Sequence, residues 1–286
     1  MLGAIIGDMV GSIYEFNPIK SKNFDIYDKK MTMTDDSLLT LAVAKVLMNN
    51  YPINYSEESL NSIKDQLIKE FALAWKNNPR AGWGNSFNCW CLEVFEKGYA
   101  KPYKSYGNGA GMRISPAAWI ANTKDELKVL SYAVTSITHD HPEGLKGAEA
   151  IAMCIWLALH GASKQTIKET MVNDYYPEIA IFDFDYLVKN YDFSEICQES
   201  VPQAIYCFLI SSSLEDTIRN CVAIGGDCDT TGAMAGAIAE AYYKTNYYSP
   251  LESNYLEKRI PIEYRELICQ FHKMVGDSRK SKANSI

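Results

Sequence analysis

Two short clusters of carboxylate and hydroxyl side chains stand out as residues that could do chemistry. The first is Thr34, Asp35 and Asp36, and the second runs from Asp227 to Thr230 as Asp-Cys-Asp-Thr. Each cluster offers two carboxylates and a threonine hydroxyl, and carboxylates this crowded repel one another unless a cation neutralises them. Oxygen ligands suit hard divalent ions such as Mg²⁺ or Mn²⁺. The pair of clusters therefore predicts a site for two such ions.

Helix capping offers a simpler interpretation of both clusters, because each one precedes a segment with helical periodicity. Thr34 would be the N-cap, and the aspartates would favour the positive end of the helix dipole. One capping group is enough to start a helix, however, so two carboxylates and a hydroxyl at both places are redundant. Gly225 and Gly226 allow a sharp turn just before the second cluster, and Gly232 and Gly236 would let a neighbouring helix approach closely. The duplication favours a metal site.

The elements that must position these clusters are predicted to be helices. Apolar residues recur at helical spacing, and strand-like alternation is scarce. The patterned segments are 38–47, 63–75, 127–137, 148–159, 164–172, 202–210, 216–224, 230–244 and 262–274. Turn residues predict loops at 77–79, 106–109, 141–144 and 225–226. With no long linker and no fixed repeat, we expect an all-α, compact orthogonal bundle in a single domain over 1–286, with a frayed tail from about 277 to 286.

Composition narrows the class of protein. A formal net charge of −7 argues against nucleic acid as a partner, because such binding needs clustered cations. No apolar run is long enough to span a membrane, and the apolar N-terminal run lacks the features of a signal peptide. The cysteines fall largely within apolar patterns, which favours reduced, buried thiols. We expect a soluble, cytoplasmic monomer.

Five motifs resemble, in their order, those of the ADP-ribosylglycohydrolase family. The resemblance extends from Gly3 to Thr230, and no familiar motif follows Lys244. Five ordered motifs are far more specific than any one alone. They are Gly3–Glu15 (GAIIGDMVGSIYE), Thr32–Ser37 (TMTDDS), Gly107–Arg113 (GNGAGMR), Thr138–Pro142 (THDHP) and Gly225–Thr230 (GGDCDT).

The resemblance implies an all-α fold with a dinuclear Mg²⁺ or Mn²⁺ centre at the bottom of a cleft. By motif position Glu15 lies on a segment near the metals, and His139 lies beside the substrate. The implied metal ligands are Thr34, Asp35, Asp36, Asp227, Asp229 and Thr230. The implied substrate-binding residues are Asn108, Gly109, Met112 and His139.

Without the family, several of these residues have ordinary explanations. Glu15 could be an exposed turn residue, and Asn108 with Gly109 forms a common turn dipeptide. His139 and His141 could be surface loop residues or caps of the following helix. Arg113 could bind phosphate or pair with an acidic neighbour. The roles of Arg113 and His141 stay open at this point.

The implied reaction is hydrolysis of the glycosidic bond between ADP-ribose and an acceptor, which reverses ADP-ribosylation. The substrate would be an ADP-ribosylated protein or an ADP-ribose conjugate of a small molecule. Arginine is the expected acceptor, with serine or another linkage as alternatives. We expect two metal ions to fix the ribose and a carboxylate, Glu15 or Asp35, to accept the proton of the attacking water.

Two other functions remain possible at this point. The first is a family member that binds ADP-ribose without catalysis, because fold alone does not confer activity. The second is a dinuclear metal hydrolase of phosphoesters or nucleotides, although no P-loop is evident.

Overall fold

The computed structural model describes residues 1–244 and 259–283, with side chains described as far as Gly276. Within these residues the chain forms helices and no strand, and one antiparallel bridge joins Gly107 to Ile196. The elements are α1 (Leu2–Gly11), α2 (Asp35–Asn49), α3 (Glu57–Asn77), α4 (Asn85–Lys97), α5 (Gly109–Met112), α6 (Ser115–Ile120), α7 (Lys124–Thr135), α8 (Pro142–Leu159), α9 (Lys164–Asp174), η1 (Pro177–Ile181), α10 (Phe184–Asn190), α11 (Cys197–Leu209), α12 (Leu214–Ile224), α13 (Cys228–Tyr243) and α15 (Ile262–Ala283). The predicted all-α class is confirmed.

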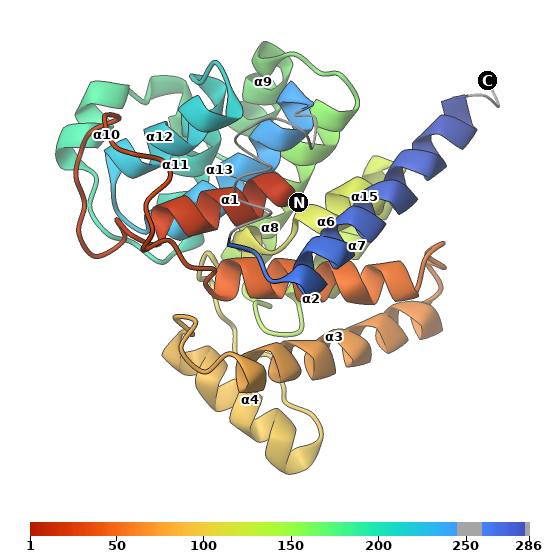
Figure 1. Cartoon of the computed structure of the whole chain (residues 1–286). Helices are drawn as coiled ribbons and strands as arrows, with labels where there is room; N and C mark the ends of the chain where they lie inside the picture. Colours follow the sequence, from red (N-terminus) through yellow and green to blue (C-terminus); the bar gives the residue numbers. More distant parts are fainter. Residues whose placement is uncertain (245–258, 284–286) are drawn as a thin grey trace.

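Helices α1 and α13 lie side by side in the middle of the molecule (Figure 1). Glycines one turn apart allow the contact, because a Cβ built on Gly7 would lie 2.0 Å from the carbonyl oxygen of Gly232. A Cβ on Gly3 would likewise lie 2.3 Å from the carbonyl oxygen of Gly236. Only glycine allows backbones to come this close. The crossing brings the C-terminal end of α1 against the start of α13, where the second acidic cluster lies.

Every helical pattern that the sequence shows is part of a helix. The helices often begin at a Ser or Thr whose side-chain oxygen accepts a backbone N–H, as the capping rule requires. One loop boundary was wrong: the turn expected at 141–144 is the start of α8, because His141 is its N-cap and Pro142 fills the first helical position. Of the predicted frayed tail at 277–286, residues 277–283 continue helix α15 and residues 284–286 lie outside the described residues, so fraying stays a prediction.

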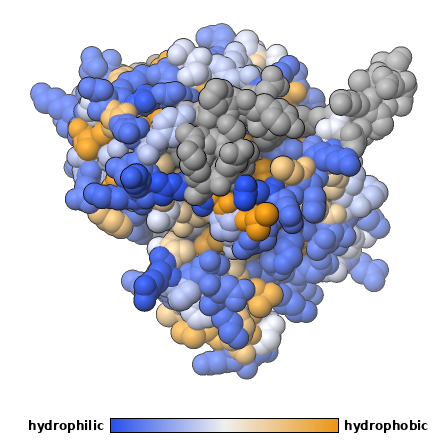
Figure 2. Space-filling model, in the orientation of Figure 1, coloured by the Kyte–Doolittle hydropathy of each residue, from blue (hydrophilic) through white to orange (hydrophobic). Residues whose placement is uncertain are grey.

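The helices α3 and α4 form the lower part of the molecule in Figure 1. Figure 2 shows hydrophobic atoms in this lower part of the molecule. Leu92 and Phe95 of α4 are exposed hydrophobic side chains. All eight cysteines are free, and six of them are buried, as the apolar patterns around them predict. Among the described residues, no helix combines the length and the apolar character that crossing a bilayer requires.

Candidate metal centre and substrate cleft

The acidic side chain of Asp8, on α1, holds the start of α2. Asp8 is completely buried, and its Oδ2 accepts the backbone N–H groups of Thr34 at 3.0 Å and Ser37 at 3.1 Å. Its two oxygens also accept the hydroxyl groups of Thr34, at 2.7 Å, and of Ser37. Four donors to one carboxylate fix the position of the first acidic cluster relative to α1.

The two acidic clusters meet at the junction of α1, α2 and α13. Thr230 donates its hydroxyl to Asp36 Oδ2 at 3.2 Å, which joins the second cluster to the first. Carboxylate oxygens of Asp8, Asp36 and Asp229 all lie within 4.8 Å of one another, and so do those of Glu15, Asp227 and Asp229. Asp229 thus belongs to two carboxylate groups, an arrangement that two neighbouring cations would fit.

Burial and mutual repulsion disfavour the charged forms of these acids. Burial raises the pKa of Asp36 and of Asp229 well above the usual value, and neighbouring carboxylates raise both further. Asp35, half-buried, is affected in the same way. Burial also raises the pKa of Asp8 to about 6, although its hydrogen bonds oppose the shift. We call these four acids, Asp8, Asp35, Asp36 and Asp229, the acidic floor of the cleft. Their charged forms at neutral pH have a free-energy cost, which a bound cation would remove.

Capping explains the first cluster only in part and the second hardly at all. Thr34 is the N-cap of α2, and its hydroxyl oxygen accepts from the Asp36 N–H at a long 3.4 Å. Asp227 is the N-cap of α13, but its side chain makes no capping bond. The Asp227 carboxylate instead accepts a hydrogen bond from Asn108 Nδ2 at 2.6 Å. The side chain of Cys228, between the two aspartates, points away from them to the Gly11 carbonyl.

Glu15 follows α1 on an irregular segment that leads to α2. It is half-buried, and burial together with Asp227 and Glu195 raises its pKa to about 7. The middle of this segment is anchored to the rest of the fold by Lys20, whose ammonium group donates to the carbonyls of Tyr191 and Ile224, both at 2.6 Å. The anchor lies five residues after Glu15.

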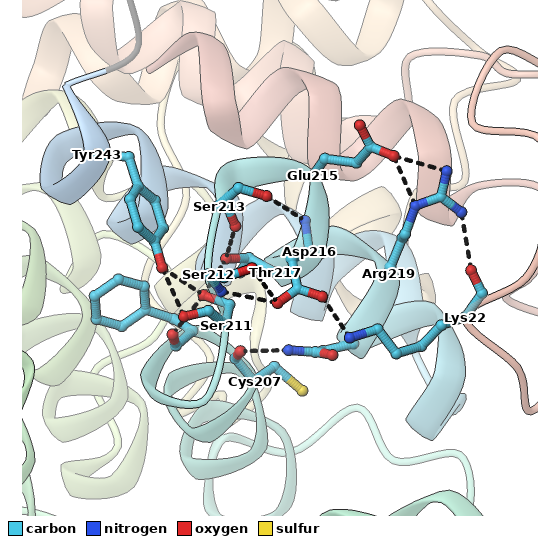
Figure 3. A network of polar contacts seen from close by, with 12 residues as sticks. Lys22, Cys207, Ser211, Ser212, Ser213, Glu215, Asp216, Thr217, Arg219 and Tyr243 are labelled. Atoms are coloured by element: carbon cyan, nitrogen blue, oxygen red, sulfur yellow. Dashed lines mark hydrogen bonds and ion pairs between the residues drawn. The ribbon is translucent and has the colours of Figure 1, made fainter.

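A second anchor of the same segment is a polar network on α12 (Figure 3). Lys22 pairs with Asp216, and Arg219 pairs with Glu215 at 2.7 Å. Arg219 also donates to the backbone carbonyl of Lys22 at 2.9 Å and that of Phe24 at 2.8 Å. These contacts leave Glu15 on a short stretch between helix α1 and two fixed points.

All eleven residues singled out from the sequence line one cleft with a volume of about 590 Å³. They are Glu15, Thr34, Asp35, Asp36, Asn108, Gly109, Met112, His139, Asp227, Asp229 and Thr230. Their roles as ligands or catalysts remain predictions, but their convergence from five segments on one cavity is a property of the structure.

Another part of the cleft lining, here called the wall, contains Arg113 and His139. His139 is buried, so the surface-loop interpretation of this residue is wrong. Arg113 is also buried, and its guanidinium donates to Thr138 and stacks on Phe71. Of the alternatives for Arg113, pairing with an acid is not found among the described residues. His141 does not line the cleft, and it caps α8 by accepting the N–H of Glu143.

Two features of the site were missed from the sequence. Asp8 was quoted within a motif but given no role, although an aspartate inside an apolar helix is a signal that could have identified it. The aromatic side chains Trp83 and Phe87, which line the cleft, were also missed. Their rings stack with centroids 5.3 Å apart. A planar group could pack against them.

Known proteins share this sequence pattern and fold. A model of the ADP-ribosylglycohydrolase family matches residues 1–268. ADP-ribosylhydrolase ARH3 of Mus musculus is 25% identical, over 85% of this chain and 82% of that protein. The ADP-ribosylarginine hydrolase of Pseudomonas putida is 23% identical, over 87% of this chain and 71% of that protein.

Comparison with solved structures gives the same fold. The chain named "ADP-ribosylglycohydrolase-related protein complex" superposes with a TM-score of 0.71 and 21% identity, over 96% of this chain and 97% of that one. Because the family model matches most of the sequence, this chain belongs to the ADP-ribosylglycohydrolase family.

Proposed function

We propose that this protein hydrolyses the glycosidic bond between ADP-ribose and an acceptor, and that the acceptor is arginine. The observation that carries the proposal is the cleft, which brings both acidic clusters and the predicted substrate residues together. The chain belongs to a family of ADP-ribosylglycohydrolases, which supports the same reaction. The Pseudomonas putida relative, an ADP-ribosylarginine hydrolase, supports arginine. The acidic side chains Glu15 and Glu195 at the cleft support it as well, because a guanidinium group is cationic.

We further propose that the cleft holds two Mg²⁺ or Mn²⁺ ions. The proposed ligands are Thr34, Asp35, Asp36, Asp227, Asp229 and Thr230. Asp36 Oδ1 is a buried oxygen without a hydrogen-bond partner, and the raised pKa values of the acids likewise fit an environment built for added positive charge. Asp8 fits a supporting role better than a ligand role, since both its oxygens already accept hydrogen bonds.

The residues of the chain can supply the remaining steps. Divalent ions, when bound, would supply positive charge that holds the ribose hydroxyls and favours deprotonation of water. Glu15 would accept the proton of the attacking water, because its carboxyl group lines the cleft next to Asp227 and Asp229. Asp35 is the alternative base. Asn108, Gly109, Met112 and His139 would bind the ADP-ribosyl group.

The proposed site draws on residues from both ends of the first 230 positions, which supports one functional domain over the chain. A cytoplasmic location and a monomeric state stay predictions.

The test is turnover of the purified protein on arginine-linked and serine-linked ADP-ribose with added Mg²⁺ or Mn²⁺. We expect free ADP-ribose from the arginine-linked substrate. Faster release from the serine-linked substrate would overturn the assigned acceptor and leave the reaction class intact. Binding of ADP-ribose without hydrolysis of either substrate would favour a non-catalytic protein, and release of inorganic phosphate would favour a phosphoester hydrolase.

A further inference from the structure

Arg113 is a buried cation without an anionic partner. Only 1% of its side chain is exposed, and in the part of the chain that the structure describes no ion pair includes it. Its guanidinium stacks on the ring of Phe71 at 4.8 Å, and Nη2 donates to Thr138 Oγ1 at 2.5 Å. A buried charge is costly unless it is well bound, so this arrangement needs an explanation.

The hydrogen bonds around Arg113 have only one self-consistent direction. A guanidinium can donate but cannot accept, so the Thr138 oxygen must be the acceptor in that contact. The single proton of the Thr138 hydroxyl is then free to point to His139 Nδ1, which lies 2.8 Å away. Nη2 of Arg113 itself lies 3.3 Å from the same ring nitrogen. Two donors therefore face His139 Nδ1.

The opposite tautomer fits poorly. A proton on His139 Nδ1 would place two N–H donors 3.3 Å apart. It would also leave the hydroxyl proton of buried Thr138 without a side-chain acceptor among the described residues. A doubly protonated ring would add a second buried cation beside Arg113. Burial and Arg113 accordingly lower the pKa of His139 well below its usual value.

The remaining ring nitrogen, Nε2, faces the cleft. A Cβ built on Gly109 would lie 3.1 Å from it, and one built on Gly107 would lie 3.7 Å away. Both glycines line the cleft, as does His139. The glycines thus leave space in front of an N–H group that has no hydrogen-bond partner among the described residues.

We propose that Arg113 and Thr138 are positioning residues that hold His139 as a neutral ring with its proton on Nε2, directed at a hydrogen-bond acceptor of the bound ligand. The inference rests on the proposed function only for the identity of that acceptor, which would be an oxygen or a ring nitrogen of the ADP-ribosyl group. A buried neutral donor suits a crowded acidic cleft, because it binds an acceptor without introducing a charge that the acids would attract. Arg113 donates to Thr138, Thr138 donates to His139, and His139 donates to the ligand, which is the final acceptor.

Nitrogen-15 NMR of the histidine rings tests the tautomer directly in the full-length wild-type protein. The chain has four histidines, so loss of one set of signals in a His139→Phe variant assigns His139. We expect one form with a protonated Nε2 and a bare Nδ1. A protonated Nδ1, or two tautomers of similar population, would overturn the inference. Because the spectrum is that of the wild-type protein, misfolding of a variant could not explain such a result.

Variants of Arg113 test whether this residue sets the tautomer of His139. Arg113→Met removes the donor with little change in length and frees the Thr138 oxygen to accept from Nδ1, so we expect both tautomers and an affinity for ADP-ribose weakened by about 3- to 10-fold. Arg113→Lys is the matched control, because an ammonium group still donates, and it should keep the Nε2–H form. Calorimetry with ADP-ribose supplies the affinities.

Two outcomes separate the inference from the proposed function. An affinity loss in Arg113→Met with an unchanged Nε2–H spectrum would mean that Arg113 acts on the ligand directly, which would overturn its positioning role. A wild-type protein with the Nε2–H form that neither binds ADP-ribose nor hydrolyses its conjugates would contradict the proposed function and would support the hydrogen-bond relay.

Discussion

The acidic floor and the wall of the cleft bury charges of opposite sign, and each stabilises its charge differently. In the floor, Asp36 and Asp229 crowd one another, and burial with neighbouring acids raises both pKa values. In the wall, Arg113 is buried as deeply but stacks on Phe71 and donates to Thr138. Arg113 thus has an aromatic ring and a hydroxyl acceptor, although its Nε has no hydrogen-bond partner, whereas the floor gathers acids without a cation. It follows that divalent ions should affect the floor strongly and the wall weakly.

Removal of a floor carboxylate should have the largest effect. Asp229→Asn and Asp36→Asn should each lower the rate of ADP-ribose release by more than about 100-fold, since even residues that only support a metal ligand are worth 10- to 100-fold. The control is Asp65→Asn on the exposed side of α3. Without metal, the two floor variants should melt no lower than the wild type, because they relieve repulsion. Full activity in either variant would contradict the assignment of Asp36 and Asp229 as metal ligands.

Glu15 should matter for the reaction more than for binding. Glu15→Gln should lower kcat by about 100-fold or more with a much smaller change in KM, as loss of a general base does. Glu195→Gln, another cleft carboxylate, is the comparison and should change kcat far less. If both variants lost kcat equally, the base would not be Glu15.

The two sides should respond to pH with opposite signs. Folding raises the pKa of Asp8 from 3.8 to about 6 and that of Glu15 from 4.5 to about 7. The folded state therefore binds these protons more tightly, and the stability that they contribute at low pH is lost as the pH rises to about 7. For Asp8 alone the upper bound is roughly 3 kcal/mol. The melting temperature of chelator-treated protein should fall over this range, and Mg²⁺ should oppose the fall.

His139 has the reverse sign, because its pKa is lowered in the folded state. The stability that the neutral His139 ring contributes is complete above pH 6.5, the usual pKa of histidine, and is lost as the pH falls. A His139→Phe variant should therefore lose stability more steeply than the wild type as the pH rises toward 6.5. An identical pH dependence in the two proteins would mean that the wall does not titrate as described.

The floor also depends on the close contact of α1 and α13. Gly7→Ala should lower the free energy of unfolding by about 1 to 3 kcal/mol, since the added methyl group would meet the Gly232 backbone. Gly276→Ala in α15 is the matched control, because a Cβ there meets nothing within 4 Å, and it should be neutral or slightly stabilising. Urea unfolding measures both. Equal stability of the two variants would contradict the described contact.

The smallest effect is expected at the exposed anchor of the Glu15 segment. Lys22→Met should change the free energy of unfolding by less than about 1 kcal/mol, because the Lys22–Asp216 pair is partly exposed to solvent. Lys45→Met, which breaks the comparable pair with Glu70, is the control. Lys22→Met should lower kcat by a few fold, and the control should not. A kcat loss as large as that of Glu15→Gln would contradict this prediction and would mean that the anchor is as important for catalysis as Glu15.

Periodicity predicted nine of the described helices, and residue type indicated the site's main residues. The predicted helices are α2, α3, α7, α8, α9, α11, α12, α13 and α15, whereas α1, α4, α5, α6 and α10 were not predicted. Local patterns specify helices well, and two acidic clusters are visible in the sequence itself. Helix α4 was missed because exposed Leu92 and Phe95 blur its buried face. Asp8 received no role, because α1 is buried on all sides and no pattern indicates which neighbours its carboxylate meets.

The hydrogen-bond relay of the wall could not be predicted at all. Thr138 and His139 are adjacent in sequence, but Arg113 and Phe71 come from distant segments. The direction of the relay depends on distances of 2.5 and 2.8 Å that only the packed fold defines. The same holds for Asp227, whose partner Asn108 lies 119 residues away.

The most direct test of the account is the dependence of ADP-ribose release on divalent ions. Protein treated with chelator should release no ADP-ribose from an arginine-linked substrate, and added Mg²⁺ or Mn²⁺ should restore release and raise the melting temperature together. At an ion concentration 100 times the dissociation constant the gain in stability should be about 2.7 kcal/mol. Full activity in the chelated, metal-free protein would contradict the role assigned to the acidic floor.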